Sequence, residues 1–271
     1  MKYVRFLHQG RESYGLLEGD AVLPFEGDLF GERRPTGVRL PLAEVTLLAP
    51  VRPSKIIAVA LNYMDHLPTG GGFVSSARGG PASGGGERGR EAPAAPELFL
   101  KAPSAVVGPE EGIVIPAGAG RVDAEGELVA IIGRRVWGVS PEEALGCVLG
   151  YTCGNDVSAR EWQRGDIQWW RAKSSDTFAP VGPCIADELD PAKLEFETRV
   201  NGEVKQRGNT RLLIHDVAHI ISFASRVMTL EPGDLIFTGT PGATPTLSPG
   251  DVVEVEIEGI GVLRNHVRGE G

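Results

Sequence analysis

The run of residues 121–133 constrains the fold of this chain more than any other stretch. Its apolar second half, residues 128–133, is typical of a buried β-strand. Because side chains alternate along a strand, we expect Asp123, Glu125 and Glu127 to project from one face of a single strand. Three carboxylates on one face repel each other unless they are solvated or neutralised. The run therefore predicts either a solvent-facing acidic strand or a site for a hard cation such as Mg²⁺.

A further carboxylate, Asp156, lies two residues before Ser158, which we expect to cap a short helix. An Asp at a helix entry can simply interact with the positive end of the helix. The alternative is that Asp156 is a third oxygen ligand beside Glu125 and Glu127. Three carboxylates would leave coordination positions of a Mg²⁺ ion for water and for a chelating substrate.

Bulk properties exclude several classes of protein. With 271 residues, 41% of them hydrophobic, the chain can form one main domain and a small appendage. A formal charge of −9 argues against nucleic-acid and anionic-membrane partners, and no apolar run approaches the roughly twenty residues that span a bilayer. The N-terminus lacks the apolar core of a signal peptide. We therefore expect a soluble, cytoplasmic protein, whose three widely spaced cysteines are reduced thiols: Cys147, Cys153 and Cys184.

The patterning predicts a mixed, β-rich α+β fold. Short alternating runs broken by turns indicate a small β-rich N-terminal domain over residues 1–50, followed by a main domain over residues 51–271. Strands are expected at residues 55–60, 194–200, 235–238 and 252–257, with a hairpin at Asn201-Gly202. Three helices are expected, with caps at Ser140, Ser158 and Asp216.

Residues 67–97 differ in kind from the rest, because 9 of the 31 are Gly and 4 are Pro. Such a segment cannot bury enough apolar surface to offset its ordering entropy. It is either a tolerated surface insertion or a lid over a site. His66 immediately precedes it and could act as a general base, although most single histidines have no such role.

Two other segments could carry chemistry. Lys173 lies among small and hydroxyl residues, which predicts partial burial, and a buried lysine must pair with a carboxylate or lose its proton. Near a metal it could stabilise an enolate or transfer a proton; a structural salt bridge is the alternative. Residues 237–242 end a strand in a Gly-rich turn, whose N–H groups could hold a substrate carboxylate or form an ordinary turn.

Taken in order, these motifs resemble the fumarylacetoacetate hydrolase family over residues 53–268. The matching segments are residues 55–66, Glu125-x-Glu127 before residues 128–133, Asn155-Asp156-x-Ser158-x-Arg160, Ala172-Lys173-Ser174 with Asp176-Thr177, and residues 237–241. The resemblance, especially to diene-dioate isomerase and acylpyruvate hydrolase-like members, implies a mixed β-sandwich roll that is usually homodimeric, with one Mg²⁺ or Mn²⁺ per subunit. It also implies small oxo- and dioxo-carboxylic acid substrates, which are cleaved between carbons, decarboxylated or tautomerised.

Carried over position by position, the resemblance implies roles for individual residues. The implied metal ligands are Glu125, Glu127 and Asp156; the implied catalytic residues are Lys173 and His66; the implied substrate contacts are Arg160, Gln163 and Thr240. One departure matters. Hydrolytic members carry a Glu three residues after the histidine, and here that position is Thr69. Either Glu87, Glu91 or Glu97 replaces it, or water activation is weak, which would favour isomerase or decarboxylase chemistry.

The leading hypothesis is a metal-dependent enzyme acting on oxo acids of aromatic-compound catabolism. Its expected partners are a small-molecule oxo acid and a second copy of the chain, with no nucleic acid and no membrane. One alternative is a non-catalytic binding protein that kept the fold, and another is a structural protein stabilised by calcium.

Overall fold

The computed structural model describes residues 1–66 and 92–271. Strands dominate the described chain, and its α-helices are short: α1 (Pro141–Ala144), α2 (Arg160–Gly165), α3 (Trp170–Ser174) and α4 (Val217–Ser225). Short 3₁₀ turns are η1 (Leu42–Glu44), η2 (Met64–His66), η3 (Pro103–Ala105), η4 (Leu145–Cys147) and η5 (Thr210–Leu212). The predicted mixed β-rich fold is confirmed. Within the described ranges, no helix is both long and apolar enough to cross a membrane.

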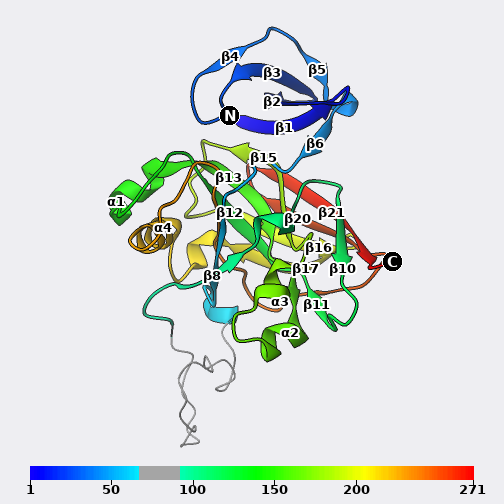
Figure 1. Ribbon diagram of the computed structural model, residues 1–271, viewed down its shortest axis with the longest axis vertical. Coiled ribbons are helices and arrows are strands. Elements are labelled where there is room, and N and C mark those ends of the chain that lie inside the picture. Colours follow the sequence, from blue (N-terminus) through cyan, green and yellow to red (C-terminus); the bar gives the residue numbers. More distant parts are fainter. Residues whose placement is uncertain (67–91) are drawn as a thin grey trace, which may run out of the picture.

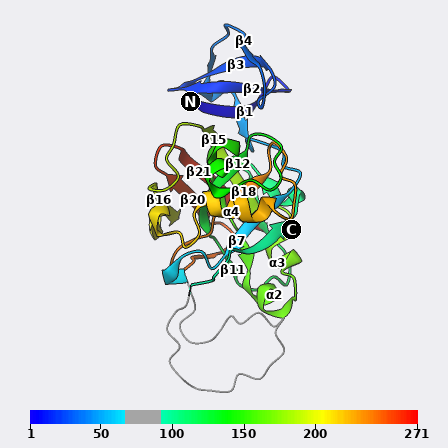
Figure 2. The ribbon, with the colours of Figure 1, turned by 90° about the vertical axis from the view of Figure 1, so that its left-hand side faces the viewer.

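The N-terminal strands form a small β-rich domain at one end of the molecule (Figures 1 and 2). They are β1 (Lys2–His8), β2 (Arg11–Glu18), β3 (Ala21–Gly27), β4 (Arg33–Pro35), β5 (Leu40–Pro41) and β6 (Thr46–Leu48). Strand β1 pairs antiparallel with β15 (Ala179–Ala186), with Lys2 opposite Ala186. The N-terminal domain therefore continues the main sheet.

The main sheet continues from β15 through the strands that carry the site. In spatial order they are β13 (Val148–Asn155), β12 (Gly126–Ile132), β18 (Leu235–Phe237), β7 (Ile56–Ala60) and β8 (Glu97–Lys101), and β9 (Val106–Val107) pairs with β15. Every residue of β12 is buried, because strands flank it on both edges and cores lie on both faces. This explains the unbroken apolar run after Glu127.

A second sheet packs on the main sheet. Its order is β10 (Gly112–Ile115), β21 (Gly261–Gly269), β20 (Val252–Ile257), β16 (Glu195–Val200) and β17 (Glu203–Asn209). Leu128 and Cys153 of the main sheet share one core with Phe196 and Val255 of this sheet, as in a β-sandwich. The predicted hairpin is confirmed at Asn201-Gly202, where both residues have positive φ.

A third, small sheet corrects one prediction. It consists of β14 (Ser158–Ala159), β11 (Val122–Asp123) and β19 (Thr246–Leu247). Residues 121–133 are therefore two strands in two sheets, not one strand. The chain leaves the first strand at Ala124, which is fully buried and donates its N–H to the Pro245 carbonyl at 2.9 Å. Packing of Ala124 into a separate core overrides the alternation that the sequence suggested.

The helix starts agree with the predictions in two of three cases. The capping box at Ser140 and Glu143 opens α1, and Asp216 accepts the His219 N–H at the start of α4. The predicted cap at Ser158 is wrong, because its hydroxyl donates to the Asp156 carbonyl at 2.8 Å and α2 begins only at Arg160. Helix α3 was not predicted. All three cysteines are buried free thiols.

Candidate active site

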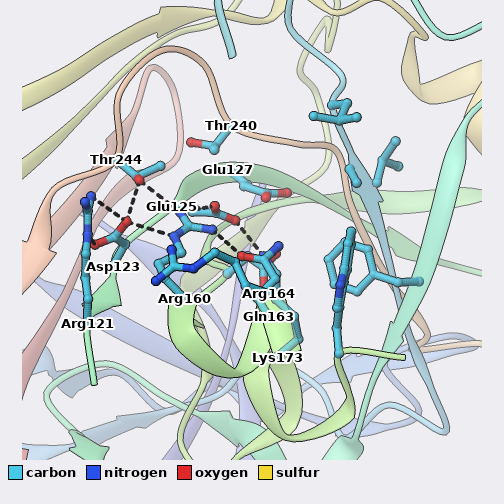
Figure 3. A pocket seen from close by; sticks show the side chains of 16 residues that line it. Arg121, Asp123, Glu125, Glu127, Arg160, Gln163, Arg164, Lys173, Thr240 and Thr244 are labelled. Carbon is cyan, nitrogen blue, oxygen red and sulfur yellow. Dashed lines mark hydrogen bonds and ion pairs between the residues drawn. The ribbon is translucent and has the colours of Figure 1, made fainter. Parts of the chain in front are cut away.

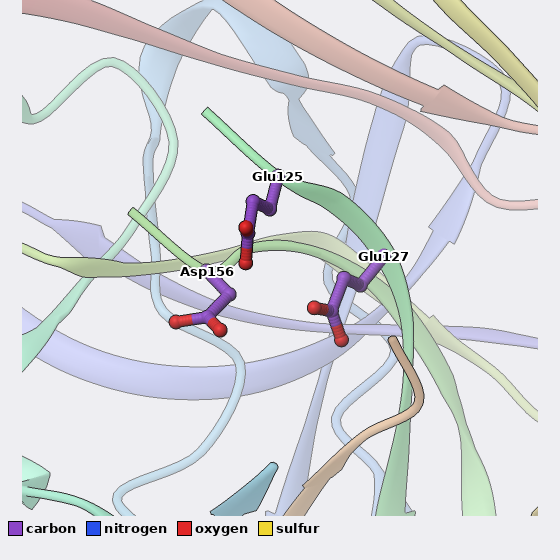
Figure 4. A group of neighbouring side chains, drawn as sticks. All are labelled: Glu125, Glu127 and Asp156. Carbon is purple, nitrogen blue, oxygen red and sulfur yellow. The ribbon is translucent and has the colours of Figure 1, made fainter. Parts of the chain in front are cut away.

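Three buried carboxylates meet where β12 begins and β13 ends. Glu127 is on β12, Glu125 directly precedes that strand, and Asp156 directly follows β13. Because the two strands are antiparallel, with Gly126 opposite Asn155, their ends lie side by side. Each carboxylate offers an oxygen, and these oxygens all lie within 4.8 Å of one another (Figure 4). The predicted ligand set is thus brought together, and its all-oxygen donors fit a hard divalent ion.

Backbone hydrogen bonds hold this trio of carboxylates in place. Asn155 Oδ1 accepts the Glu125 N–H, and the Asp156 N–H donates to the Glu125 carbonyl, both at 2.9 Å. Glu127 Oε2 accepts the N–H of Gly239 at 2.6 Å. The Gly-rich turn after β18 therefore has one N–H directed at a protein carboxylate, whereas the sequence left a substrate carboxylate and an ordinary turn as the alternatives.

Two buried lysines contact the trio. Lys173, on α3, places its Nζ 2.8 Å from Glu125 Oε2 and also contacts Asp156 Oδ2. Lys101, the last residue of β8, is fully buried and contacts the other oxygen of the same Asp156 carboxylate. Lys101 was missed at the level of sequence, since a lysine ending an apolar strand is usually exposed. Phe99 lies against Lys173, with the Nζ 5.0 Å from the ring centroid.

The three carboxylates of the trio are not equally paired with cations: Glu125 and Asp156 each contact two cationic side chains. Glu127 contacts no cationic side chain among the described residues, and burial together with Asp156 and Glu125 raises its pKa well above the ordinary value. Burial disfavours the charge of Lys173, but Asp156 and Glu125 outweigh it and raise the pKa. Burial lowers the pKa of Lys101 despite its contact with Asp156. Repulsion among the three buried carboxylates is what a divalent ion held by them would relieve.

Asp123 has a different role from the one expected. It anchors two arginines, accepting from Arg121 Nε at 2.7 Å and from Arg160 Nε at 2.8 Å (Figure 3). Burial opposes its ionisation, but the bonds from these arginines outweigh burial and lower its pKa. Asp123 is therefore a charged, arginine-paired carboxylate, outside the trio formed by Glu125, Glu127 and Asp156.

The three predicted substrate contacts line the same cavity, and each already has protein partners. Arg160 donates through its two Nη atoms to Glu125 at 2.6 Å and to Gln163 at 2.8 Å. Thr240 donates its hydroxyl to the Gly126 carbonyl at 2.9 Å. These bonds fix the side chains before any ligand arrives, which is what preorganised recognition needs.

The cavity has a volume of about 310 Å³, at the small end of the range for ligand sites. Its lining is Val59, Ala60, Leu61, Phe99, Arg121, Asp123, Glu125, Glu127, Asp156, Arg160, Gln163, Arg164, Trp169, Lys173, Thr240 and Thr244 (Figure 3). Sequence reasoning missed Arg164, although its position four residues after Arg160 on one helix was a usable signal.

The remaining predictions concern the segment after β7. His66 is the last residue of η2. Thr69, Glu87 and Glu91 lie outside the described residues, as does the proposed lid up to residue 91. Glu97 begins β8 opposite Ala60, is exposed, and does not line the cavity.

Comparisons with known proteins agree with this geometry. A family model described as the fumarylacetoacetate (FAA) hydrolase C-terminal domain matches residues 55–268, and one described as Rv2993c-like, N-terminal matches residues 1–50. The mitochondrial oxaloacetate tautomerase FAHD2A of Bos taurus is 37% identical over 93% of this chain and 78% of the relative.

Two solved structures share the whole fold. The 5-carboxymethyl-2-hydroxymuconate delta-isomerase of Mycobacterium smegmatis superposes with a TM-score of 0.88 at 41% identity, covering 100% of both chains. Maleylpyruvate hydrolase of Sphingobium sp. SYK-6, in complex with manganese(II) and pyruvate, superposes with a TM-score of 0.79 at 31% identity, again over 100% of both chains.

Proposed function

Because this chain belongs to the fumarylacetoacetate hydrolase family, we propose that it is a divalent-metal-dependent enzyme that acts on small 2-oxo carboxylic acids through an enolate. The observation that carries the proposal is the buried trio of Glu125, Glu127 and Asp156, with Lys173 Nζ 2.8 Å from Glu125. The trio would hold Mg²⁺ or Mn²⁺. The manganese and pyruvate bound to the maleylpyruvate hydrolase support both the metal and the substrate class.

The chemistry follows from the arrangement of charges. When bound, the divalent ion supplies positive charge where an enolate oxygen develops negative charge. Lys173 is buried beside the trio, and its contacts with Asp156 and Glu125 raise its pKa, so it can donate a proton to the enolate carbon or stabilise the negative charge. Arg160 holds Gln163 in place through a 2.8 Å hydrogen bond, and the positive charge of Arg160 together with the amide N–H groups of Gln163 would orient the substrate carboxylate.

Among the family's reactions, we propose keto–enol tautomerisation or decarboxylation ahead of hydrolysis. Both need enolate stabilisation and proton transfer, which Lys173 can provide, whereas hydrolysis also needs an activated water. The position that carries the water-activating Glu in hydrolytic members is Thr69 here. Similarity to an oxaloacetate tautomerase also favours tautomerisation over hydrolysis.

Three further features belong to this proposal. We propose that the chain forms a homodimer, that residues 1–50 and 51–271 are its two domains, and that it works in the cytoplasm in aromatic-compound catabolism. The opposite hypothesis, a non-catalytic binding protein, is not favoured, because the three residues expected to hold the metal lie together and Lys173 contacts one of them.

The test is keto–enol tautomerisation of oxaloacetate, followed by ultraviolet absorbance. The protein is first treated with a chelator, then supplied with Mg²⁺, Mn²⁺ or Ca²⁺. We expect activity to disappear on chelation and to return with Mg²⁺ or Mn²⁺. Acylpyruvates assayed in parallel report hydrolysis. Binding of metal with no turnover of any of these substrates would favour the binding protein, and stabilisation by Ca²⁺ alone would favour a structural ion.

A further inference from the structure

The cavity lining holds equal numbers of cationic and anionic side chains. Four are cationic and four are carboxylates: Arg121, Arg160, Arg164 and Lys173 on one side, and Asp123, Glu125, Glu127 and Asp156 on the other. Lys101 and Glu161, which contact this lining from outside, add one charge of each sign. With a divalent ion on the trio, the described lining would carry two excess positive charges. A monoanionic 2-oxo acid neutralises one of them, and a dianionic oxo diacid neutralises both.

The four cations differ in how many of their N–H donors are already bound to protein groups. Arg160 uses Nε and both Nη atoms on Asp123, Glu125, Gln163 and Thr244. Arg121 forms a two-point pair with Asp123, at 2.7 and 2.9 Å, and Lys173 contacts two carboxylates of the trio.

Arg164 is different. Within the described chain its guanidinium has one carboxylate contact, Nη2 to Glu161 Oε1 at 3.2 Å, and its side chain is 62% exposed. An exposed pair of this kind contributes little and is readily exchanged for another anion. Arg164 therefore has donors left for a ligand.

Helix α2 places Arg164 on the same face as Arg160, which contacts the trio. Arg160, Gln163 and Arg164 stand at positions i, i+3 and i+4 of α2, so they share one face, and all three line the cavity (Figure 3). Arg160 contacts Glu125 of the trio, and Arg164 lies one turn further along. Phe99 and Trp169, packed edge to face, add an apolar wall to the same cavity.

We propose that Arg164 is a specificity-determining residue that binds the distal carboxylate of a 2-oxo dicarboxylate. A planar guanidinium suits this role because it binds a carboxylate through two parallel hydrogen bonds. The inference rests on the proposed function for the placement of the 2-oxo acid end at the trio. It goes beyond that function by naming the residue that would select a diacid over a monoacid.

The experiment compares acids that differ only at the distal end. Binding of 2-oxoglutarate and of 2-oxopentanoate, in which a methyl group replaces the distal carboxylate, is measured by calorimetry with saturating Mg²⁺. The proteins are wild type, Arg164→Gln, Arg164→Lys and the control Arg135→Gln. Arg135 is an exposed arginine paired with Glu231 and does not line the cavity.

We expect wild type and Arg135→Gln to prefer the diacid by about 10- to 100-fold, the scale of a charge-assisted hydrogen bond. The preference should fall below about threefold in Arg164→Gln and be partly restored in Arg164→Lys. A wild type without preference, or an Arg164→Gln protein that keeps it, would overturn the inference.

A second readout separates this inference from the proposed function. Exchange of the C3 protons of oxaloacetate and 2-oxobutanoate with D₂O is followed by NMR in the same four proteins. If wild type exchanges the C3 protons of neither acid, the proposed enolate chemistry is wrong. The binding data would still decide the role of Arg164. If exchange occurs, the ratio of kcat/KM for the two acids should change in parallel with the binding preference.

Discussion

Gly239 donates its backbone N–H to Glu127 Oε2 across 2.6 Å, although the two residues are 112 positions apart in the chain. This bond joins the turn after β18 to the start of β12, where the candidate metal ligands lie. Gly239 has a φ of +98°, and a Cβ at this position would lie only 2.8 Å from Asn62 Cβ. A side chain here would therefore displace the turn that holds Glu127.

Gly239→Ala should destabilise the protein by about 1–3 kcal/mol, through backbone strain and the contact with Asn62. It should also weaken Mg²⁺ binding. The control is Gly250→Ala, because Gly250 has the same φ of +98° with nothing within 4 Å of its Cβ. Urea denaturation and calorimetry measure both effects. Equal losses of stability and metal affinity in the two variants would show that the turn has no special link to Glu127.

Glu127→Gln should reduce Mg²⁺ affinity by about 100-fold or more and abolish most activity, since it removes one of three charged ligands. The metal-free variant should be at least as stable as wild type, because Glu127 is a buried carboxylate without a cationic partner among the described residues. Glu203→Gln, at an exposed position, is the control. Unchanged Mg²⁺ binding in calorimetry would remove Glu127 from the ligand set.

Lys173→Met should lower kcat by about two orders of magnitude or more, the scale for loss of a positioned proton donor or charge stabiliser. The matched control is Lys193→Met, whose side chain is exposed and pairs only with Asp190 among the described residues. Steady-state kinetics on the enolisable substrate provide the measurement. A normal kcat with a raised KM would assign Lys173 to substrate binding.

Lys101→Met should reduce the free energy of unfolding by about 3 kcal/mol in metal-free protein, because it breaks a fully buried ion pair with Asp156. Lys205→Met breaks an exposed pair with Glu203 and should cost less than about 1 kcal/mol. Urea unfolding followed by circular dichroism compares the two. Similar costs for both lysines would mean that the Lys101 pair contributes no more than a surface contact.

The thiols should be inert in the folded protein. Burial raises the pKa of the Cys184 thiol to about 11 and that of Cys153 well above its usual range. Unfolded thiols ionise near about pH 8.5. As pH rises from there towards 11, the unfolded chain loses these protons and the folded chain keeps them, so stability falls with pH. DTNB at pH 8 should label no cysteine in native protein and all three in denaturant, because all three thiols are buried; rapid labelling of native protein would contradict that burial.

Local sequence patterns predicted the strands well, because alternation and turn residues act over a few positions. The strands at residues 55–60 and 252–257 and the Asn201-Gly202 hairpin all formed as expected. The single strand over residues 121–133 did not, since the burial of Ala124 in another core is a long-range effect. Helix α3, only five residues long, had too little periodicity to be recognised.

By itself, the sequence determined which residue types were available: a set of carboxylates, one lysine among small residues, and strands with enough apolar character to bury them. Only the tertiary structure decided which carboxylates meet at the candidate metal site and which one pairs with arginines. The antiparallel pairing of β12 and β13 brought Glu125, Glu127 and Asp156 together. Asp123, at the end of β11, instead pairs with Arg121 and Arg160. The tertiary structure also brought Lys101 to Asp156 from 55 residues away. The physical reason is that a charge interacts with whatever lies within a few ångströms, and that distance is set by strand pairing and packing, not by spacing along the chain.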